Sequence, residues 1–213
     1  MTLLVSPSRS LPVLFLAVSA CAAAQAPPDF APLFAGTLGQ ATIENGGAFT
    51  VEGGVLRAEG PEGWLRFPPL VRDFRLRVEL KFLTDDADSG VFFRALPDGA
   101  FARGWPNRSY QVQLLNPLAG SQVPPVGGLF RHGMPPGETT LDREAVNAAF
   151  TGTGEWQLLE VEVIGTDLTV RLNGAPVTKA AGIADVAGYI GIQSETSAVE
   201  FRRIDIEVID SRR

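Results

Sequence analysis

The chain is poor in the residues that most often carry cross-links, metal ions and nucleophilic chemistry. Its 213 residues include one cysteine, one histidine and two methionines. A single cysteine excludes intramolecular disulfides, so core packing and sheet hydrogen bonds must hold the fold together. A single histidine excludes a multi-histidine metal site and argues against a serine-type catalytic triad. We expect that residue, His132, to have a structural role or to lie on the rim of a site.

The longest apolar run lies near the N-terminus and is too short to span a bilayer. It extends from Leu11 to Ala20, roughly ten residues, a length typical of the apolar part of an export signal. Val18-Ser19-Ala20-Cys21 resembles a lipobox, in which cleavage precedes a cysteine that becomes lipidated. We expect a lipoprotein-type signal peptide over residues 1–20, lipidation of Cys21, and a periplasmic or cell-surface lipoprotein. Ordinary cleavage within residues 22–26 would instead give a soluble periplasmic or secreted protein.

Basic residues are outnumbered, with 18 lysines and arginines against 24 acidic residues and a formal net charge of −6. This balance argues against nucleic acid as a partner. The glycines occur in turn-like segments and not in a loop that leads into a helix, so no nucleotide phosphate site is expected. Contact with a membrane is expected only through the lipid anchor, and the sequence leaves the oligomeric state undetermined.

Alternating apolar and polar residues dominate the rest of the chain and predict β-strands. Residues 74–82 alternate strictly, with apolar side chains on one face and charges on the other. The runs 159–163 and 168–172 flank Gly165-Thr166-Asp167 and predict a hairpin, and Asn173-Gly174 favours the next tight turn. The residues of these strands that should face the core are Phe74, Leu76, Val78, Leu80, Phe82, Val161, Val163, Leu168, Val170 and Leu172.

The strand pattern predicts a single all-β domain over residues 33–210, built as a two-sheet antiparallel sandwich and preceded by a tether over residues 21–32. A change of parity around Arg202-Arg203 predicts a β-bulge. Only residues 139–150 favour a helix, where Thr139 and Asp142 could form a capping box.

One strand carries a pair of polar side chains that suit a carbohydrate ligand. In Tyr110–Asn116, alternation places Gln111 and Gln113 side by side on one face. Each amide offers a donor and an acceptor to vicinal hydroxyls, and a rigid strand fixes their spacing. The alternative is a solvated polar face without a ligand.

Other candidate residues come from three further segments. Gly191, Gln193 and Glu195 share one parity, and the glycine would leave room for a ligand over that face. Arg94 should share a face with Phe92, although it could equally form a surface ion pair. Trp105 lies in a polar loop, where its ring could stack on the C–H face of a sugar or simply anchor the loop.

In these segments the chain resembles the 3-keto-disaccharide hydrolase family, formerly a domain of unknown function, of the concanavalin A-like lectin and glucanase superfamily. The resemblance extends from about Phe30 to Val208 and implies a jelly-roll sandwich with the ligand on its concave sheet. That position implies substrate-binding roles for Arg94, Gln111, Gln113 and Gln193. The matching pieces, which occur in the family's order, are Phe34-Ala35-Gly36, residues 49–56, Asp73-Phe74-Arg75-Leu76, residues 89–94, Tyr110–Asn116, Gly154-Glu155-Trp156, Leu172-Asn173-Gly174, Gly191-Ile192-Gln193 and residues 199–202.

The chain departs from this family at the positions that matter most for catalysis. Gln111 stands where the family typically has glutamate, and Asn116, a further substrate-binding candidate, stands where it typically has aspartate. Glu195 lies about where many members have histidine, which leaves it as the candidate catalytic residue. An amide cannot take up a proton at useful pH, so restoring glutamate at position 111 would be expected to raise activity.

The resemblance implies an exported enzyme that cleaves the glycosidic bond of 3-keto-glycosides by acid/base elimination and hydration. The alternatives are a non-catalytic, lectin-like glycan-binding module and an adhesion or interaction sandwich, because a fold alone does not fix a function. The expected partner is a carbohydrate. No cofactor or metal ligand set is indicated, although a structural calcium ion, which concanavalin A-like sandwiches sometimes carry, is left open.

Overall fold

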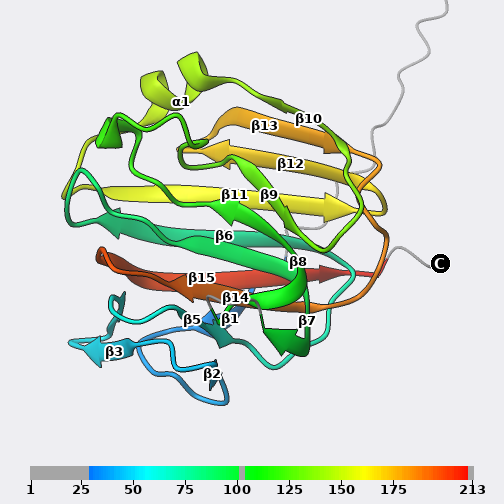
Figure 1. Cartoon of the computed structure of the whole chain (residues 1–213), viewed down its shortest axis with the longest axis horizontal. Coiled ribbons are helices and arrows are strands. Elements are labelled where there is room, and N and C mark those ends of the chain that lie inside the picture. Colours follow the sequence, from blue (N-terminus) through cyan, green and yellow to red (C-terminus); the bar gives the residue numbers. More distant parts are fainter. Residues whose placement is uncertain (1–28, 101–103, 211–213) are drawn as a thin grey trace, which may run out of the picture.

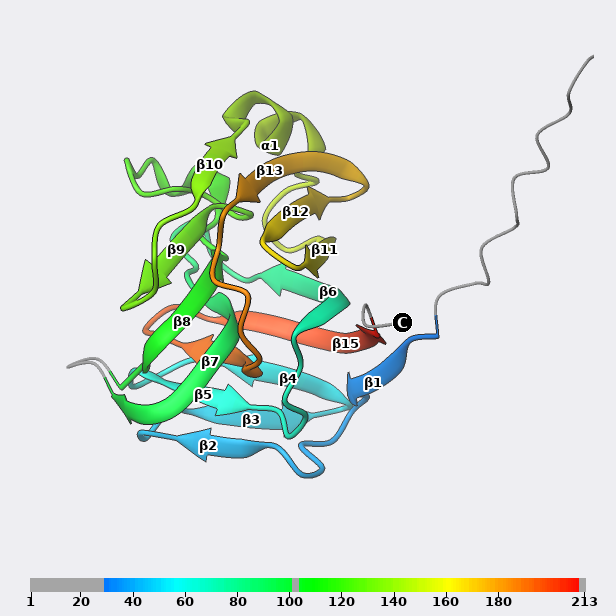
Figure 2. The same ribbon diagram turned by 90° about the vertical axis from the view of Figure 1, so that its right-hand side faces the viewer.

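The computed structural model describes residues 29–100 and 104–210 and shows two antiparallel sheets packed face to face (Figures 1 and 2). The predicted signal peptide over residues 1–20 and the lipidation site Cys21 lie outside the described residues. In the described part, no helix is long and apolar enough to cross a membrane. The all-β, two-sheet prediction is thereby confirmed.

The larger sheet has nine strands and forms one layer of the sandwich. Strand β1 pairs with β15 beside the main path of the sheet. Because β1 begins at Ala31, the sandwich starts two residues before the predicted boundary at residue 33. Along the path the strands are β10 (Glu138–Leu141), β13 (Ala175–Ala181), β12 (Asp167–Leu172), β11 (Trp156–Ile164), β6 (Asp73–Phe82), β15 (Val199–Ile209), β4 (Val55–Ala58) and β3 (Phe49–Glu52), with β1 (Ala31–Phe34) beside β15.

The smaller sheet has six strands and forms the other layer. Its strands, in order, are β2 (Thr42–Glu44), β5 (Gly63–Arg66), β14 (Tyr189–Ser194), β7 (Gly90–Ala100), β8 (Pro106–Gln113) and β9 (Leu129–His132). A short 3-10 helix, η1 (Pro117–Ala119), follows β8. The core lies between the two sheets, and all ten residues predicted to face it are at most 2% exposed. Strict alternation therefore identified the buried face correctly.

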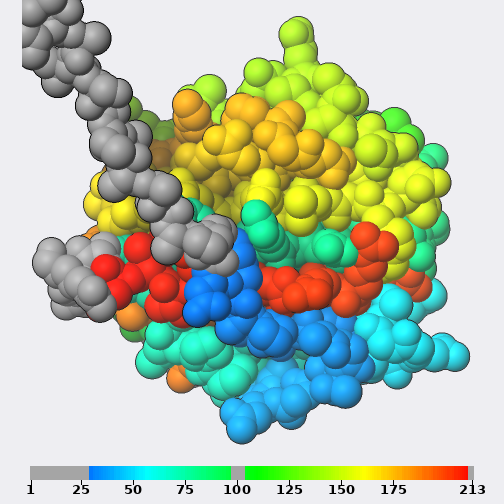
Figure 3. Space-filling view, turned by 180° about the vertical axis from the view of Figure 1, so that it is seen from behind, coloured from blue at the N-terminus to red at the C-terminus, as the bar shows by residue number. Residues whose placement is uncertain are grey.

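The outer face of the nine-stranded sheet carries a ladder of ion pairs (Figure 3 looks onto this face). Arg75 on β6 contacts Glu162 on β11 at 2.5 Å and Glu207 on β15 at 3.1 Å. Lys81 on β6 contacts Glu200 on β15 at 2.7 Å. Because opposite charges face each other across the strands, the ladder favours this strand register.

Two further predictions concern local backbone features of the larger sheet. The hairpin of β11 and β12 forms with Val161 opposite Val170, and the turn that follows has positive φ angles at Asn173 and Gly174. The ladder between β15 and β6 shifts register between Phe201 and Arg203. Both the predicted tight turn and the predicted bulge are confirmed.

The helix predicted over residues 139–150 begins later in the structure, at Arg143. Residues 138–141 form β10 at the edge of the larger sheet, and helix α1 spans only Arg143–Ala149. Its N-cap is Asp142, whose carboxylate accepts from the backbone N–H of Ala145 at 2.9 Å. Thr139 instead belongs to the ladder with β13. The pairing partner on β13, which lies far along the chain, outweighs the local capping signal.

Candidate active site

The outer face of the six-stranded sheet carries three glutamines that touch one another, which we call the amide row (Gln113, Gln111 and Gln193). Gln111 and Gln113 come from β8, and Gln193 comes from β14, two strands away. All three are buried: Gln111 is 3% exposed, Gln113 is 4% exposed and Gln193 is 1% exposed. Buried amides need hydrogen-bond partners, and here they provide them for one another.

Gln111 is the centre of the amide row. Its Nε2 donates to Oε1 of Gln113 at 2.7 Å and to Oε1 of Gln193 at 2.8 Å. Its own Oε1 lies 2.8 Å from Nε2 of His132 on β9. Three of the hydrogen-bonding positions of Gln111 are therefore occupied by protein groups.

A carboxylate stands at each end of the amide row. Gln113 donates through Nε2 to Oδ1 of Asp88 at 2.8 Å. Gln193 donates through Nε2 to Oε2 of Glu195 at the same distance. Asp88 and Glu195 are half-buried, in contrast to the glutamines between them. The site thus has a neutral, buried floor with acidic groups at its two ends.

Two glycines make room for the side chains of this floor. A Cβ atom at Gly90 on β7 would lie 2.2 Å from Nε2 of Gln111, so the absent side chain lets that amide reach across β7. A Cβ atom at Gly191 would lie 2.4 Å from the ring of Trp64. The room expected for a ligand over Gly191 is therefore filled by Trp64, which corrects the prediction from the sequence.

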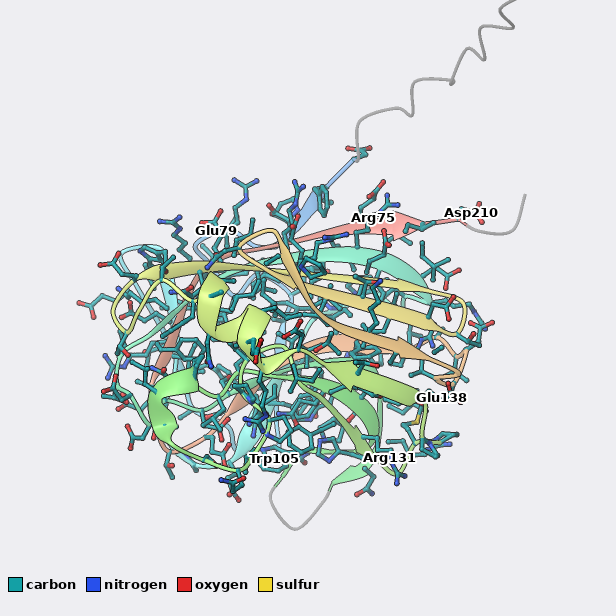
Figure 4. The ribbon with its side chains drawn as sticks, turned by 90° about the horizontal axis from the view of Figure 1, so that it is seen from above. Arg75, Glu79, Trp105, Arg131, Glu138 and Asp210 are labelled. Atoms are coloured by element: carbon teal, nitrogen blue, oxygen red, sulfur yellow. The ribbon has the colours of Figure 1, made fainter. Side chains whose placement is uncertain are left out.

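An aromatic cluster lies next to the amide row. The rings of Trp64 and Phe92 meet edge to face with centroids 6.0 Å apart. The imidazole of His132 lies 5.9 Å from the ring of Phe92 and 6.0 Å from that of Trp105. Figure 4 shows Trp105 on the opposite side of the molecule from Arg75, which belongs to the ion-pair ladder. Trp105 is half-buried and lies beside His132, and its role in binding a sugar stays a prediction.

A charged rim flanks the site on the strands β2 and β5. Arg66 donates through Nε to Glu44 at 2.8 Å. Its guanidinium also lies over the ring of Tyr189, 4.5 Å from the centroid. The arginine is therefore held between a carboxylate and an aromatic face.

Arg94 does not lie on this face, contrary to the expectation from strand parity. Between the pairs Phe92 with Gly191 and Ala95 with Tyr189, β7 contains one residue more than β14. Arg94, with φ of 49°, lies within this irregularity, and the extra residue reverses the direction of its side chain. Its guanidinium is fully buried.

The buried guanidinium of Arg94 joins chain segments at one end of the sandwich. It donates to the carbonyl oxygens of Ala184 and Gly165, the latter at 2.6 Å, and lies 3.8 Å from the carboxylate of Asp73. Burial lowers the pKa of Arg94 from its usual value, because the charged form loses solvation. These contacts give Arg94 a role in holding the fold.

Asn116 also lies away from the amide row. It is 1% exposed, and its side chain caps η1 by accepting from the backbone N–H of Leu118 at 3.0 Å. It donates to the carbonyl of Thr84 and to the hydroxyl of Thr153, which come from segments next to the larger sheet. The structure therefore gathers Gln111, Gln113, Gln193 and Glu195 but leaves Asn116 outside. The binding roles of the gathered residues stay predictions.

Sequence reasoning did not identify Asp88 as a member of the site. It also placed His132 in a structural or rim position, whereas the imidazole contacts the central glutamine of the row. The pairing of Ser109 with His132 across β8 and β9 sets the imidazole on the face of the amide row. Burial lowers the pKa of His132 from its usual value of about 6.5, which favours the neutral imidazole at pH 7. Strand parity in the segment that ends at His132 was the available signal, but the partner strand could not be read from the sequence.

Within the described residues, no group of three or more His, Cys, Asp or Glu side chains could hold a metal ion.

Comparison with known protein families identifies the chain. Residues 29–207 match the family of 3-keto-alpha-glucoside-1,2-lyase-like domains. The chain belongs to this family. No curated protein matches it.

Solved structures with the same fold include enzymes and binding modules. Two Parabacteroides distasonis proteins, provisionally assigned as glycosyl hydrolases, are 20% and 16% identical, with TM-scores of 0.65 and 0.63. Each match covers 85% of this chain, and 100% and 94% of the two proteins. The carbohydrate-binding module CBM66 from Bacillus subtilis is 13% identical with a TM-score of 0.53, over 82% of this chain and 96% of the module. At these identities the likeness concerns the fold.

Proposed function

We propose that the protein is an exported enzyme that cleaves the glycosidic bond of 3-keto-glycosides on the outer face of the six-stranded sheet. The observation that carries the proposal is the half-buried carboxylate of Glu195 at the end of a buried amide row, in a member of a 3-keto-glucoside lyase-like family. Half-buried groups at the ends of the row can meet a ligand, whereas the glutamines form the floor beneath it.

The chemistry follows from the keto group. A carbonyl at C3 acidifies the proton on C2, so a positioned base can remove it. The electron pair of the C2–H bond then forms a C1=C2 double bond while the bond from C1 to the glycosidic oxygen breaks, and water adds afterwards. The reaction needs one proton acceptor and one proton donor but no covalent nucleophile. Glu195 is the carboxyl group that we assign to proton transfer.

The test is turnover of a 3-keto-glucoside by the purified protein and by Glu195→Gln. The variant should lose about 100-fold or more in turnover, the scale of a lost general acid or base, while the ligand-induced shift in melting temperature changes little. The unoxidised parent glucoside should not be cleaved by either protein.

A matched control is Glu200→Gln, because Glu200 pairs with Lys81 on the larger sheet, away from the amide row. This variant should keep wild-type turnover. Full turnover in Glu195→Gln would remove the assigned role of Glu195.

The second candidate function is a lectin-like module, and one observation favours it. The central position of the amide row is Gln111, an amide that cannot exchange a proton with a sugar. A 3-keto-glucoside that raises the melting temperature of the wild type without release of its aglycone would establish binding in place of catalysis.

A further inference from the structure

The directions of the hydrogen bonds in the amide row are fixed from its ends. The carboxylate of Asp88 can only accept, so Gln113 must turn its NH2 group toward it. The Oε1 of Gln113 then faces Gln111, which must answer with an N–H group. Oε2 of Glu195 accepts from Nε2 of Gln193 at the other end, whether Oε1 of Glu195 is protonated or not, so Oε1 of Gln193 faces Gln111. Gln111 therefore presents its NH2 group to both neighbours and its oxygen to β9.

This arrangement selects one form of the only histidine. Because Oε1 of Gln111 is an acceptor, Nε2 of His132 must carry the proton of the hydrogen bond between them. In the neutral imidazole, the lone pair then resides on Nδ1. The amide row thus sets the tautomer of His132 in the way that a carboxylate or carbonyl does in other sites.

The surroundings of His132 keep it in the neutral form. The rings of Phe92 and Trp105 lie against it, and Ser109 pairs with it on β8. Asp88 and Glu195 contact Gln113 and Gln193, the two neighbours of Gln111 in the row. The charged residues that precede Ser109 and His132 in their strands, Arg108 and Arg131, have the opposite parity. Burial accordingly lowers the pKa of the imidazole.

His132 and Glu195 occupy two sides of the same pair of amides. The imidazole contacts Gln111, the carboxylate contacts Gln193, and the two glutamines contact each other. Both flanking groups are half-buried. A sugar ring over Gln111 and Gln193 would therefore lie between a neutral imidazole and a carboxyl group.

We propose that His132 is the second proton-transfer residue of the site and receives the C2 proton of the 3-keto-sugar at Nδ1. The inference rests on the proposed function. As the proton passes to Nδ1, the C2–H electron pair forms an enolate with the C3 carbonyl. The enolate then re-forms the C3 carbonyl as the C1=C2 double bond forms and the C1–O bond breaks. The departing oxygen takes its proton from the carboxyl group of Glu195. The imidazolium then returns a proton through solvent, which regenerates the carboxyl group. Oε1 of Gln111 accepts from Nε2 of the transient imidazolium throughout.

Exchange of the C2 proton separates this role from that of Glu195. The purified protein is incubated in D2O with a 3-keto-glucoside, and loss of the C2 proton signal is followed by NMR. His132→Gln, whose side chain keeps an N–H donor for Gln111, should slow the enzyme-dependent exchange about 100-fold or more. Glu195→Gln should exchange within a few-fold of the wild type while losing turnover of alkyl 3-keto-glucosides, because exchange needs only the base.

Leaving groups give an independent readout. An aryl glycoside departs without a proton donor, so Glu195→Gln should recover much of its turnover on a nitrophenyl 3-keto-glucoside, whereas His132→Gln should not. Glu200→Gln, which changes an ion pair on the larger sheet, is the control and should leave exchange and turnover unchanged. Wild-type exchange rates in His132→Gln would overturn the proposal.

The wild type supplies a measurement that does not depend on any variant. Because the chain contains one histidine, the imidazole NMR signals belong to His132 alone. The base must be neutral, so the rate of C2 exchange should fall as the pH drops through the His132 pKa, which lies below about 6.5. An exchange rate that does not follow the His132 titration would contradict the assignment. C2 exchange without aglycone release would overturn the proposed cleavage but keep His132 as the base. A wild-type protein that shows no exchange, no release and no binding would overturn both the proposed cleavage and the role of His132.

Discussion

At the scale of single residues, the structure gives Gln111 a different meaning from the one that the sequence suggested. As an isolated substitution for the family's glutamate, it implied a lost proton-transfer group. In the fold it is the donor that satisfies two neighbouring amide oxygens and the acceptor that orients His132. A glutamine at this position is therefore matched to the groups around it.

This match reverses the expectation that Gln111→Glu raises activity. A carboxylate at position 111 would place its oxygens against Oε1 of Gln113 and of Gln193, with no proton between them. Rotating either glutamine would turn its oxygen toward Asp88 or Glu195 instead. We expect a loss of about 1–3 kcal/mol in the free energy of unfolding, the cost of unsatisfied buried polar groups, with no gain in turnover.

Urea unfolding and 3-keto-glucoside turnover measure the effect of Gln111→Glu. Gln122→Glu is the matched control, because Gln122 is exposed and the same change there should leave the free energy of unfolding nearly unchanged. A Gln111→Glu protein as stable as the wild type, with higher turnover, would show that the glutamine row tolerates a carboxylate at its centre.

At the scale of strands and turns, most of the fold could be predicted because alternation reports which face of a strand is buried. The β6 strand and the hairpin of β11 and β12 were predicted in this way. The exceptions depend on partners that are distant in the chain. The irregularity at Arg94 exists only relative to β14, and the strand character of residues 138–141 exists only beside β13. Strand parity correctly placed Gln111, Gln113, Gln193 and Glu195 on one face. It misplaced Arg94, because one extra residue in β7 reverses the direction of that side chain.

The strand glycine Gly90 yields a prediction about how the amide row spans β7. Gly90→Ala introduces a Cβ atom 2.2 Å from Nε2 of Gln111, so that amide must move and its contact with Gln193 should break. We expect about 1–3 kcal/mol of destabilisation from overpacking, together with a rise in the pKa of His132 toward its usual value as its surroundings loosen. Chemical denaturation and imidazole NMR measure the two effects.

Gly53→Ala would be a poor control because Gly53 has a positive φ of 57°, which strains any other residue. Ala95→Gly serves better, since it lies on the same strand, β7, and on the same face and creates space instead of a clash. It should lower stability while leaving the pKa of His132 unchanged. An unaltered imidazole titration in Gly90→Ala would show that the amide of Gln111 does not depend on the space over Gly90.

At the scale of the whole molecule, the site and the start of the sandwich lie on different sheets. Strand β1 pairs with β15 in the nine-stranded sheet (Figure 2). The amide row lies on the outer face of the six-stranded sheet. A protein tethered through the segment that precedes β1 would therefore hold the larger sheet nearer to its anchor.

This arrangement leads to a prediction about Cys21, which we propose as the lipidated residue. Cys21→Ala should move the protein from the membrane fraction to the soluble exported fraction, because the expected acyl anchor is lost. Turnover per molecule should stay the same, since the site lies on the sheet opposite to β1. Fractionation with immunodetection, followed by a turnover assay on each fraction, measures both quantities. Ala24→Ser, a change within the predicted tether, should keep the membrane location. Membrane partition that is unchanged in Cys21→Ala would contradict the lipoprotein proposal and leave soluble export as the alternative.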